Sequence, residues 1–278
     1  AVISAGSRHG SSPSTGFNVG NFTMDHVTFT NVGSAFSHGS GQGTVVTMSN
    51  FIVDGTDASC FDFAEDTVAT LTEGVINNCN QDGNAGDGAI INVDGSTGGS
   101  LFLENTTITD AYVNLIDVDF ASVTVTNVTA TATTSQTGTA FGSAAGSGSD
   151  VMLNNFAADD YATVSIEAMD SIAMTIVDFG TAAVTITPGG TVSTGSGAAG
   201  DHAVFDDVTM GDFSMTRTQP GTFDDVSMGA FTMTGNAITS DLVKMNLMDA
   251  DAVTVSGCGW NVAITGGEMD GLSSNGCS

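Results

Sequence analysis

Two pairs of adjacent aspartates are the residues whose type and spacing come closest to a chemical site. Asp206 and Asp207 lie in FDDVTMGDFSMT, and Asp224 and Asp225 lie in its near-copy FDDVSMGAFTMT, which begins eighteen residues later. If the two copies stack, each carboxylate lies about 5 Å from its counterpart, and such like charges repel unless water or a cation separates them. Calcium binds clusters of carboxylate oxygens. The sequence therefore predicts either a calcium ladder or solvated aspartates that favour a chain turn.

Four cysteines form two pairs with the same spacing. Cys60 and Cys79 are 19 residues apart, and so are Cys258 and Cys277. An even count, without a CxxC pattern or neighbouring histidines, favours two disulfides over a metal site or free thiols. Each bridge would connect one repeat of the chain to the next. Because disulfides form in oxidising compartments, the spacing predicts an extracellular or cell-surface protein.

No other set of residues forms a recognisable catalytic site. The histidines show no ligand or triad spacing, and no serine lies in a Gly-x-Ser-x-Gly elbow between a strand and a helix. Two carboxylates about 5–10 Å apart are enough for glycoside hydrolysis, and any two neighbouring repeats could supply them. The sequence favours a protein without enzymatic activity. A carbohydrate-binding or carbohydrate-active protein is the alternative.

The chain is strongly acidic. Its 278 residues include 3 basic and 31 acidic side chains, which gives a net charge of −28. Such a surface repels nucleic acids and anionic lipids and attracts cations. No apolar run approaches the roughly 18–20 residues of a membrane span. We therefore expect neither a nucleic-acid partner nor a membrane span.

The duplicated segment alternates apolar and polar residues, as short strands do. Val208, Met210, Phe213 and Met215 would point inward, with Gly211-Asp212 as a turn between two strands. A unit of this size cannot bury its own inner face, but stacked copies can. Looser copies recur along the chain, as in NFTMDHVTFTN and LNNFAADD. Longer intervals contain Gly/Ser-rich segments, which we expect to be loop inserts, at Asn80–Ser100, Thr134–Asp150 and Pro188–Asp201.

Short strands, Asn/Asp/Gly corners and inserts between coils of about 18–24 residues resemble the right-handed parallel β-helix proteins of the pectin-lyase-like superfamily. The resemblance covers about residues 17 to 278 and implies an all-β, single-stranded, right-handed parallel β-helix (a solenoid) of about ten or more coils. Hydrolases of that superfamily carry Asn-Thr-Asp, Asp-Asp, Gly-His-Gly and Arg-Ile-Lys motifs, of which only the paired aspartates occur here. The resemblance thus concerns fold rather than activity. An antiparallel sandwich or barrel is the alternative, but it gives no reason for a near-identical repeat.

The first sixteen residues differ from the rest. Ala1, Val2, Ile3 and Ser4 begin a short apolar strand, and the polar segment behind it has the composition of a flexible linker. We therefore divide the chain into residues 1–16 and a β-helix domain at 17–278. The strand could cover the first coil of its own β-helix. It could also add to a neighbouring copy, as a strand of an assembly interface.

These features together predict a structural protein. Three Asn-x-Thr triplets, at Asn21, Asn105 and Asn127, are candidate glycosylation sites. We expect a secreted or cell-surface protein whose copies link end to end into a filament or surface layer. Its partners would be other copies of itself, and calcium is the one cofactor that the sequence suggests. In the alternative, carbohydrate-binding interpretation, the partners are glycans.

Overall fold

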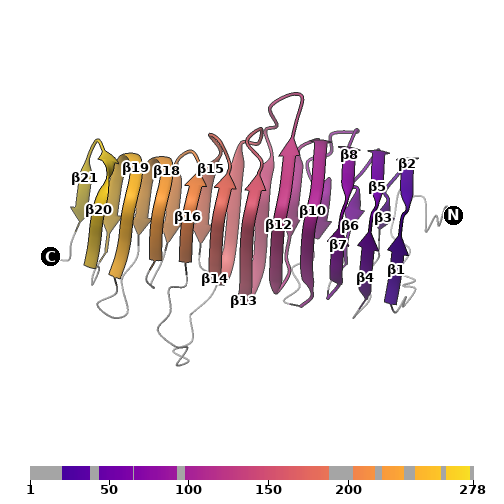
Figure 1. The fold of residues 1–278 in the computed structure, drawn as a ribbon, viewed down its shortest axis with the longest axis horizontal. Coiled ribbons are helices and arrows are strands. Elements are labelled where there is room, and N and C mark those ends of the chain that lie inside the picture. The colour runs from indigo at the N-terminus through magenta and orange to yellow at the C-terminus, as the bar shows by residue number, and fades with distance from the viewer. Residues whose placement is uncertain are drawn as a thin grey trace.

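The computed structural model is a long stack of coiled β-strands (Figure 1), and the inward side chains form one apolar core. It describes residues 21–37, 44–64, 66–92, 98–187, 203–216, 221–234, 242–257 and 261–275. Within these ranges there is no helix, and the strand pairings run parallel throughout. The protein is therefore a parallel β-helix. Because an antiparallel sandwich or barrel would pair its strands in opposite directions, that alternative is wrong.

Each coil contributes strand segments to three faces, which we call A, B and C. Face A holds β1 (Asn21–Asp25), β4 (Val45–Ser49), β7 (Val68–Thr72) and segments of β10 (Ser100–Ala111), β12 (Ser122–Thr131), β13 (Thr139–Ala157), β14 (Thr163–Asp178), β16 (Ala203–Thr209), β18 (Gly221–Thr234), β19 (Leu242–Ser256) and β20 (Asn261–Met269). Face B holds β2 (Thr28–Val32), β5 (Ile52–Thr56), β8 (Val75–Cys79) and the continuations of the longer strands. Face C holds β3 (Phe36–Ser37), β6 (Phe61–Asp62), β9 (Gly88–Asn92), β11 (Asn114–Val118), β15 (Ala183–Thr187), β17 (Phe213–Thr216), β21 (Leu272–Asn275) and the remaining segments of the longer strands.

The duplicated segment forms two consecutive coils. Phe205 of β16 pairs with Phe223 of β18, and the two rings stack with centroids 4.8 Å apart. The predicted inward residues Val208, Met210 and Phe213 are all buried, which confirms the alternation. Stacking one coil on the next buries the inner face that a single coil leaves exposed.

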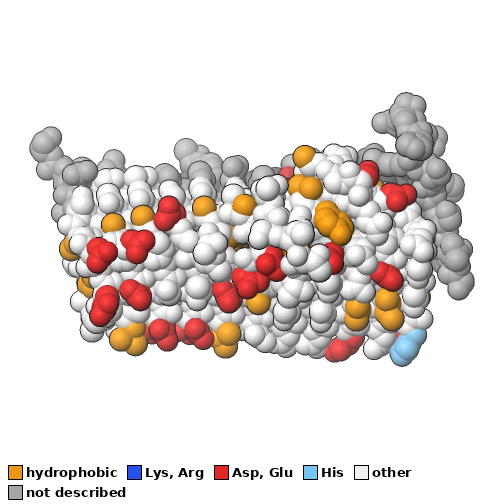
Figure 2. Space-filling view, turned by 90° about the horizontal axis from the view of Figure 1, so that it is seen from above, with side chains coloured by type: hydrophobic (Ala, Val, Ile, Leu, Met, Phe, Trp, Pro, Cys, Tyr) orange, Lys and Arg blue, Asp and Glu red, His pale blue; other side chains and the backbone are white. Residues whose placement is uncertain are grey.

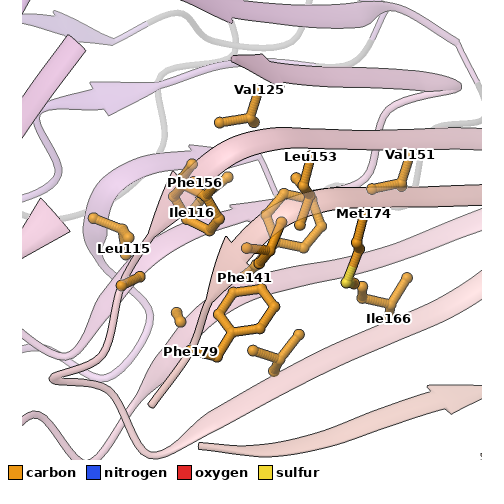
Figure 3. Packing of buried hydrophobic residues seen from close by; sticks show 14 of the residues in the cluster. Leu115, Ile116, Val125, Phe141, Val151, Leu153, Phe156, Ile166, Met174 and Phe179 are labelled. Atoms are coloured by element: carbon orange, nitrogen blue, oxygen red, sulfur yellow. The ribbon is translucent and has the colours of Figure 1, made fainter. Parts of the chain in front are cut away.

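Aromatic and aliphatic side chains from successive coils fill the interior. Figure 3 shows how Phe141, Phe156 and Phe179 pack among Leu153 and Met174 in the middle of the stack. The rings of Phe156 and Phe179 meet edge to face, 5.7 Å apart. Because each coil contributes a few such residues, the core is continuous along the whole described stack.

Two of the three predicted inserts contain strands and are not simple loops. Gly88–Asn92 lies within the segment Asn80–Ser100, and all five of its residues are buried because they fill face C between β6 and β11. In the segment Thr134–Asp150, β13 begins at Thr139 and likewise pairs with β11. The third insert, Pro188–Asp201, lies outside the described residues.

Candidate functional sites: the A–B corner and the coil ends

One residue in each coil turns the chain from face A to face B with a left-handed backbone. We call this position the A–B corner. The residues at this corner, with positive φ throughout, are His26, Asn50, Glu73, Asn105, Asn127, Asn155, Ile176, Asp207, Asp225, Leu247 and Gly266. Asn, Asp and Gly tolerate this conformation best because a short polar side chain can bond locally and glycine has no Cβ. The corner explains why Asn and Asp recur along the sequence.

Asparagine side chains at the corner form a hydrogen-bonded ladder in the middle of the stack. The amide of Asn155 donates to Oδ1 of Asn127 over 2.9 Å, and the amide of Asn127 donates to Oδ1 of Asn105, also over 2.9 Å. Asn105 in turn donates to a carboxylate oxygen of Glu73 at 2.8 Å. Four consecutive coils are thus linked by side-chain amides, in addition to their backbone pairing.

A second polar cluster lies at the corner of the first described coil. The carboxylate of Asp25 accepts hydrogen bonds from Ser49 Oγ at 2.7 Å and from the Asn50 amide at 2.8 Å. Nδ1 of His26 lies 2.7 Å from its other oxygen. These bonds, led by the one from Ser49, hold the pKa of Asp25 well below its ordinary value.

The two predicted aspartate pairs lie at and beside the corner. Asp207 and Asp225 are the corner residues of neighbouring coils, while Asp206 pairs with Asp224 on face A. The amide of Asn246, one coil further on, donates to Oδ1 of Asp224 at 2.6 Å. Because aspartate tolerates the left-handed backbone of this corner, the turn alone accounts for an aspartate at the same position in both copies of the repeat. Among the described residues, no group of three or more His, Cys, Asp or Glu side chains could hold a metal ion, and calcium binding stays a prediction.

The first predicted disulfide is present. Cys60 and Cys79 are bonded, lie on neighbouring coils with Cα atoms 5.4 Å apart, and are fully buried. Cys60 precedes β6 and Cys79 ends β8, so the bridge ties face C of one coil to face B of the next. The second predicted pair, Cys258 and Cys277, lies outside the described residues.

A carboxylate pair that the sequence analysis did not single out lies on face C. Burial raises the pKa of Asp117 to about 6, and the nearby charge of Asp119 adds to the rise. Asp117 pairs with Gly142 of the next coil, and a Cβ at that glycine would lie 2.4 Å from Asp117 Oδ1. The sequence signal was the Asp-Val-Asp alternation, because residues two apart in a strand share a face.

The three candidate glycosylation sites differ in their surroundings. Asn105 and Asn127 use their amide groups in the corner ladder. Asn21 is exposed at the start of β1. All three side chains are exposed, but a glycan on Asn105 or Asn127 would replace one hydrogen of an amide that donates in the ladder. Glycosylation itself stays a prediction.

Apolar residues that point inward are partly exposed at both ends of the described stack. At the first coil these are Met24, Val27 and Phe36, and at the last coil they are Val262, Ile264 and Met269. The same face A position is fully buried inside the stack, as at Met48 next to Met24. The strands β1, β2, β3, β20 and β21 each have a partner strand on one side only within the described residues. The predicted assembly strand, Ala1–Ser4, lies outside the described residues.

Comparisons of the chain with protein-family models, with curated proteins and with solved structures find no match. The structure shows the class of the protein, a parallel β-helix, and the pectin-lyase-like superfamily remains a resemblance of pattern. In the described residues there is no helix with the length and apolar character needed to cross a membrane.

Proposed function

We propose that the protein is an extracellular or cell-surface structural protein whose copies assemble end to end. The observation that carries the proposal is the pair of coil ends, where the strands of the described residues have a partner on one side only. Met24 and Ile264 occupy the same inward position of face A as Met48 and Met245, which are 0% and 1% exposed inside the stack. Covering these ends with another copy would bury apolar surface, which favours association.

The two ends of the stack expose different strands, β1, β2 and β3 at one end and β20 and β21 at the other. A contact between unlike ends therefore leaves a free end on each side of the pair, where further copies can add. A sheet edge with available backbone groups is a template for another strand. When unlike ends meet repeatedly, the interface is heterologous and generates an open filament rather than a closed dimer. The apolar segment Ala1–Ser4 is proposed as an additional strand at this contact, which would fix neighbouring copies to each other.

The disulfide and the surface charge support the proposed location. A buried disulfide such as Cys60–Cys79 is typical of proteins that fold in oxidising compartments. Asp and Glu side chains are spread along the length of the stack, and the described atoms of the face in Figure 2 include no Lys or Arg. Such charge keeps the sides of a filament soluble and apart.

The proposal is tested by following assembly against protein concentration. We expect sedimentation velocity to show growing species and electron microscopy to show filaments about as wide as one β-helix. Deletion of residues 1–16 distinguishes direct stacking of the coil ends from the addition of the strand Ala1–Ser4. Filaments that are unchanged by the deletion would rule out the role of Ala1–Ser4. A protein that stays monomeric at high concentration, with and without calcium, would refute the proposed function.

A carbohydrate-active β-helix is the second candidate, and Asp117 is the observation in its favour. A carboxyl group with a pKa of about 6 beside another carboxyl group is the combination that a general acid requires in glycoside hydrolysis. We would screen neutral polysaccharides for hydrolysis and binding, with Asp117→Asn as the matched variant. Hydrolysis that Asp117→Asn leaves unchanged, or no hydrolysis and no binding at all, would eliminate this candidate.

A further inference from the structure

We propose that assembling copies join head to tail in one register, with β20 and β21 of one copy paired in parallel with β1, β2 and β3 of the next. This inference rests on the proposed end-to-end assembly. It adds the polarity of the filament and the residues that meet at each junction. The partner is a second copy of this chain.

The corner residues of the two end coils define the register. Gly266 turns β20 from face A to face B with a φ of 74°, and His26 makes the same turn between β1 and β2 with a φ of 54°. In the stack, corner residues always lie over one another, as Asp207 lies over Asp225. A continuing stack therefore places His26 of one copy over Gly266 of its neighbour. A slip by one residue would turn every inward side chain outward.

With the corners aligned, the inward residues of the two ends meet. Val262 lies over Phe22 and Ile264 over Met24 on face A, while Met269 lies over Phe29 on face B, as counted from the corner. On face C, Leu272 lies over Phe36, and Leu272 is 61% exposed in the single copy. Apolar side chains thus meet apolar side chains at all these positions.

A small residue faces a larger one next to the corner. Gly267 has no side chain, and the residue that follows the corner in the first coil is Val27, which is partly buried against the core. A Cβ at Gly267 would lie 1.9 Å from the backbone oxygen of Met248, so glycine is required there by its own coil. Gly267 therefore adds no side chain to the junction, and the isopropyl group of Val27 would pack against its backbone.

The acidic residues of the two ends face threonines. In this register Asp25 lies opposite Thr265 and Glu268 lies opposite Thr28 on the outward side of the strands. Asp270, four residues after its corner, lies opposite Thr30, four residues after the other. A threonine hydroxyl can donate a hydrogen bond to a carboxylate. In a chain with a net charge of −28, the junction thus brings no two of these carboxylates together.

Residues 1–20 precede β1 in the chain, and covering of the first coil by that segment is the competing outcome. A register-specific cross-link separates the two. Thr23 and Ala263 would lie opposite each other, about 4.8 Å apart between strands, which is within the Cα range of a disulfide. We would mix Thr23→Cys with Ala263→Cys under mild oxidation, with Asn261→Cys and Thr265→Cys as the register controls. All these positions are exposed in the single copy.

We expect the Thr23/Ala263 pair to give several-fold more cross-linked dimer than either control pair or the wild-type protein. Filaments that form without this preference, or that cross-link through Thr23 to Thr23, would overturn the register and leave the proposed assembly standing. A monomeric protein without cross-links would refute both the assembly and its register, and would favour covering by residues 1–20.

A charge variant provides an independent test that does not introduce a thiol. Thr28→Asp would place a second carboxylate opposite Glu268, so we expect it to raise the concentration needed for assembly several-fold. Thr129→Asp is the matched control, because Thr129 is also an exposed face B residue two positions after the corner but lies in an internal coil. Circular dichroism confirms that both variants fold. Equal effects of the two variants on assembly would contradict the proposed junction.

Discussion

The A–B corner is built in two ways along the same stack. At Asn105, Asn127 and Asn155 the corner side chains donate hydrogen bonds from coil to coil. At Asp207 and Asp225 the same backbone turn carries two carboxylates, which repel each other. The difference shows that the β-helix dictates the left-handed backbone of the corner, whereas its side chain need only tolerate that conformation.

The core differs between the same two regions. The inward face A residues near the asparagine ladder are aliphatic, with Leu103, Val125 and Leu153 in consecutive coils. Near the aspartate corner the same position holds Phe205 and Phe223, whose rings stack. Phe223 also packs edge to face on Phe213 and Phe231. The difference is confined to face A, because near the asparagine ladder buried aromatic rings lie on the other faces, as Phe156 does on face B and Phe141 on face C.

The largest expected effect is the loss of an aromatic ring near the aspartate corner. Phe223→Ala removes a fully buried side chain from the stacked rings and should lower the free energy of unfolding by about 3–5 kcal/mol. Val125→Ala, at the same inward position near the asparagine ladder, removes fewer carbon atoms and should cost less. Denaturant unfolding measures both, with Phe102→Ala as the control on an outward phenylalanine. Equal losses for Phe223→Ala and Val125→Ala would show that the two regions do not differ in their cores.

Buried and exposed carboxylates should respond differently to pH. The pKa of Asp117 is about 6 in the folded protein and about 4 in an unfolded chain, so folding favours its protonated form. Its contribution is therefore most favourable below about pH 4 and is lost as the pH rises through about 6, at a cost of about 3 kcal/mol. Asp117→Asn should remove this part of the pH dependence. Asp249→Asn, at an exposed position, is the control, and an equal change in both variants would contradict the role of burial.

Breaking the amide ladder tests how much the asparagine corner contributes to stability. Asn127→Asp keeps the acceptor for Asn155 but places a carboxylate oxygen against Oδ1 of Asn105, where an amide now donates. We expect a loss of about 1–2 kcal/mol in the free energy of unfolding at neutral pH. Asn154→Asp is the control, because Asn154 directly precedes the corner residue Asn155 and lies on the outward side of face A. If both substitutions have the same small effect, the ladder contributes nothing beyond the corner backbone.

The sequence predicts the coil well where its repeats are bare and poorly where segments intervene. The near-copies around Phe205 and Phe223 reveal the alternation, the coil length and the turn at Asp207, because nothing separates one coil from the next. Asn105, Asn127 and Asn155 are unequally spaced, so their stacking becomes visible only once the register is known. The apolar run Gly88–Asn92 was missed because glycine-rich flanks concealed a buried strand. Asp117 was missed because burial depends on the neighbouring coils.

Converting the aspartate corner into an asparagine corner should have the smallest effect on the free energy of unfolding. Unlike the substitutions above, it should raise that free energy. Asp225→Asn removes one of two facing carboxylates and supplies an amide that can donate to Asp207, as Asn127 donates to Asn105. We expect a gain of about 0.5–1 kcal/mol at low ionic strength, and a smaller gain in high salt because the repulsion in the wild-type protein is screened. Glu104→Gln is the preferred control, because Glu104 faces Thr72 and Thr126 in the neighbouring coils. Asp249 faces Glu268 and Asp212 accepts a bond from the Ala230 amide, so neither is suitable. Added calcium distinguishes the remaining alternative: if the aspartates bind it, calcium stabilises the wild-type protein and not Asp225→Asn, whereas solvated corner aspartates give the same response to calcium in both.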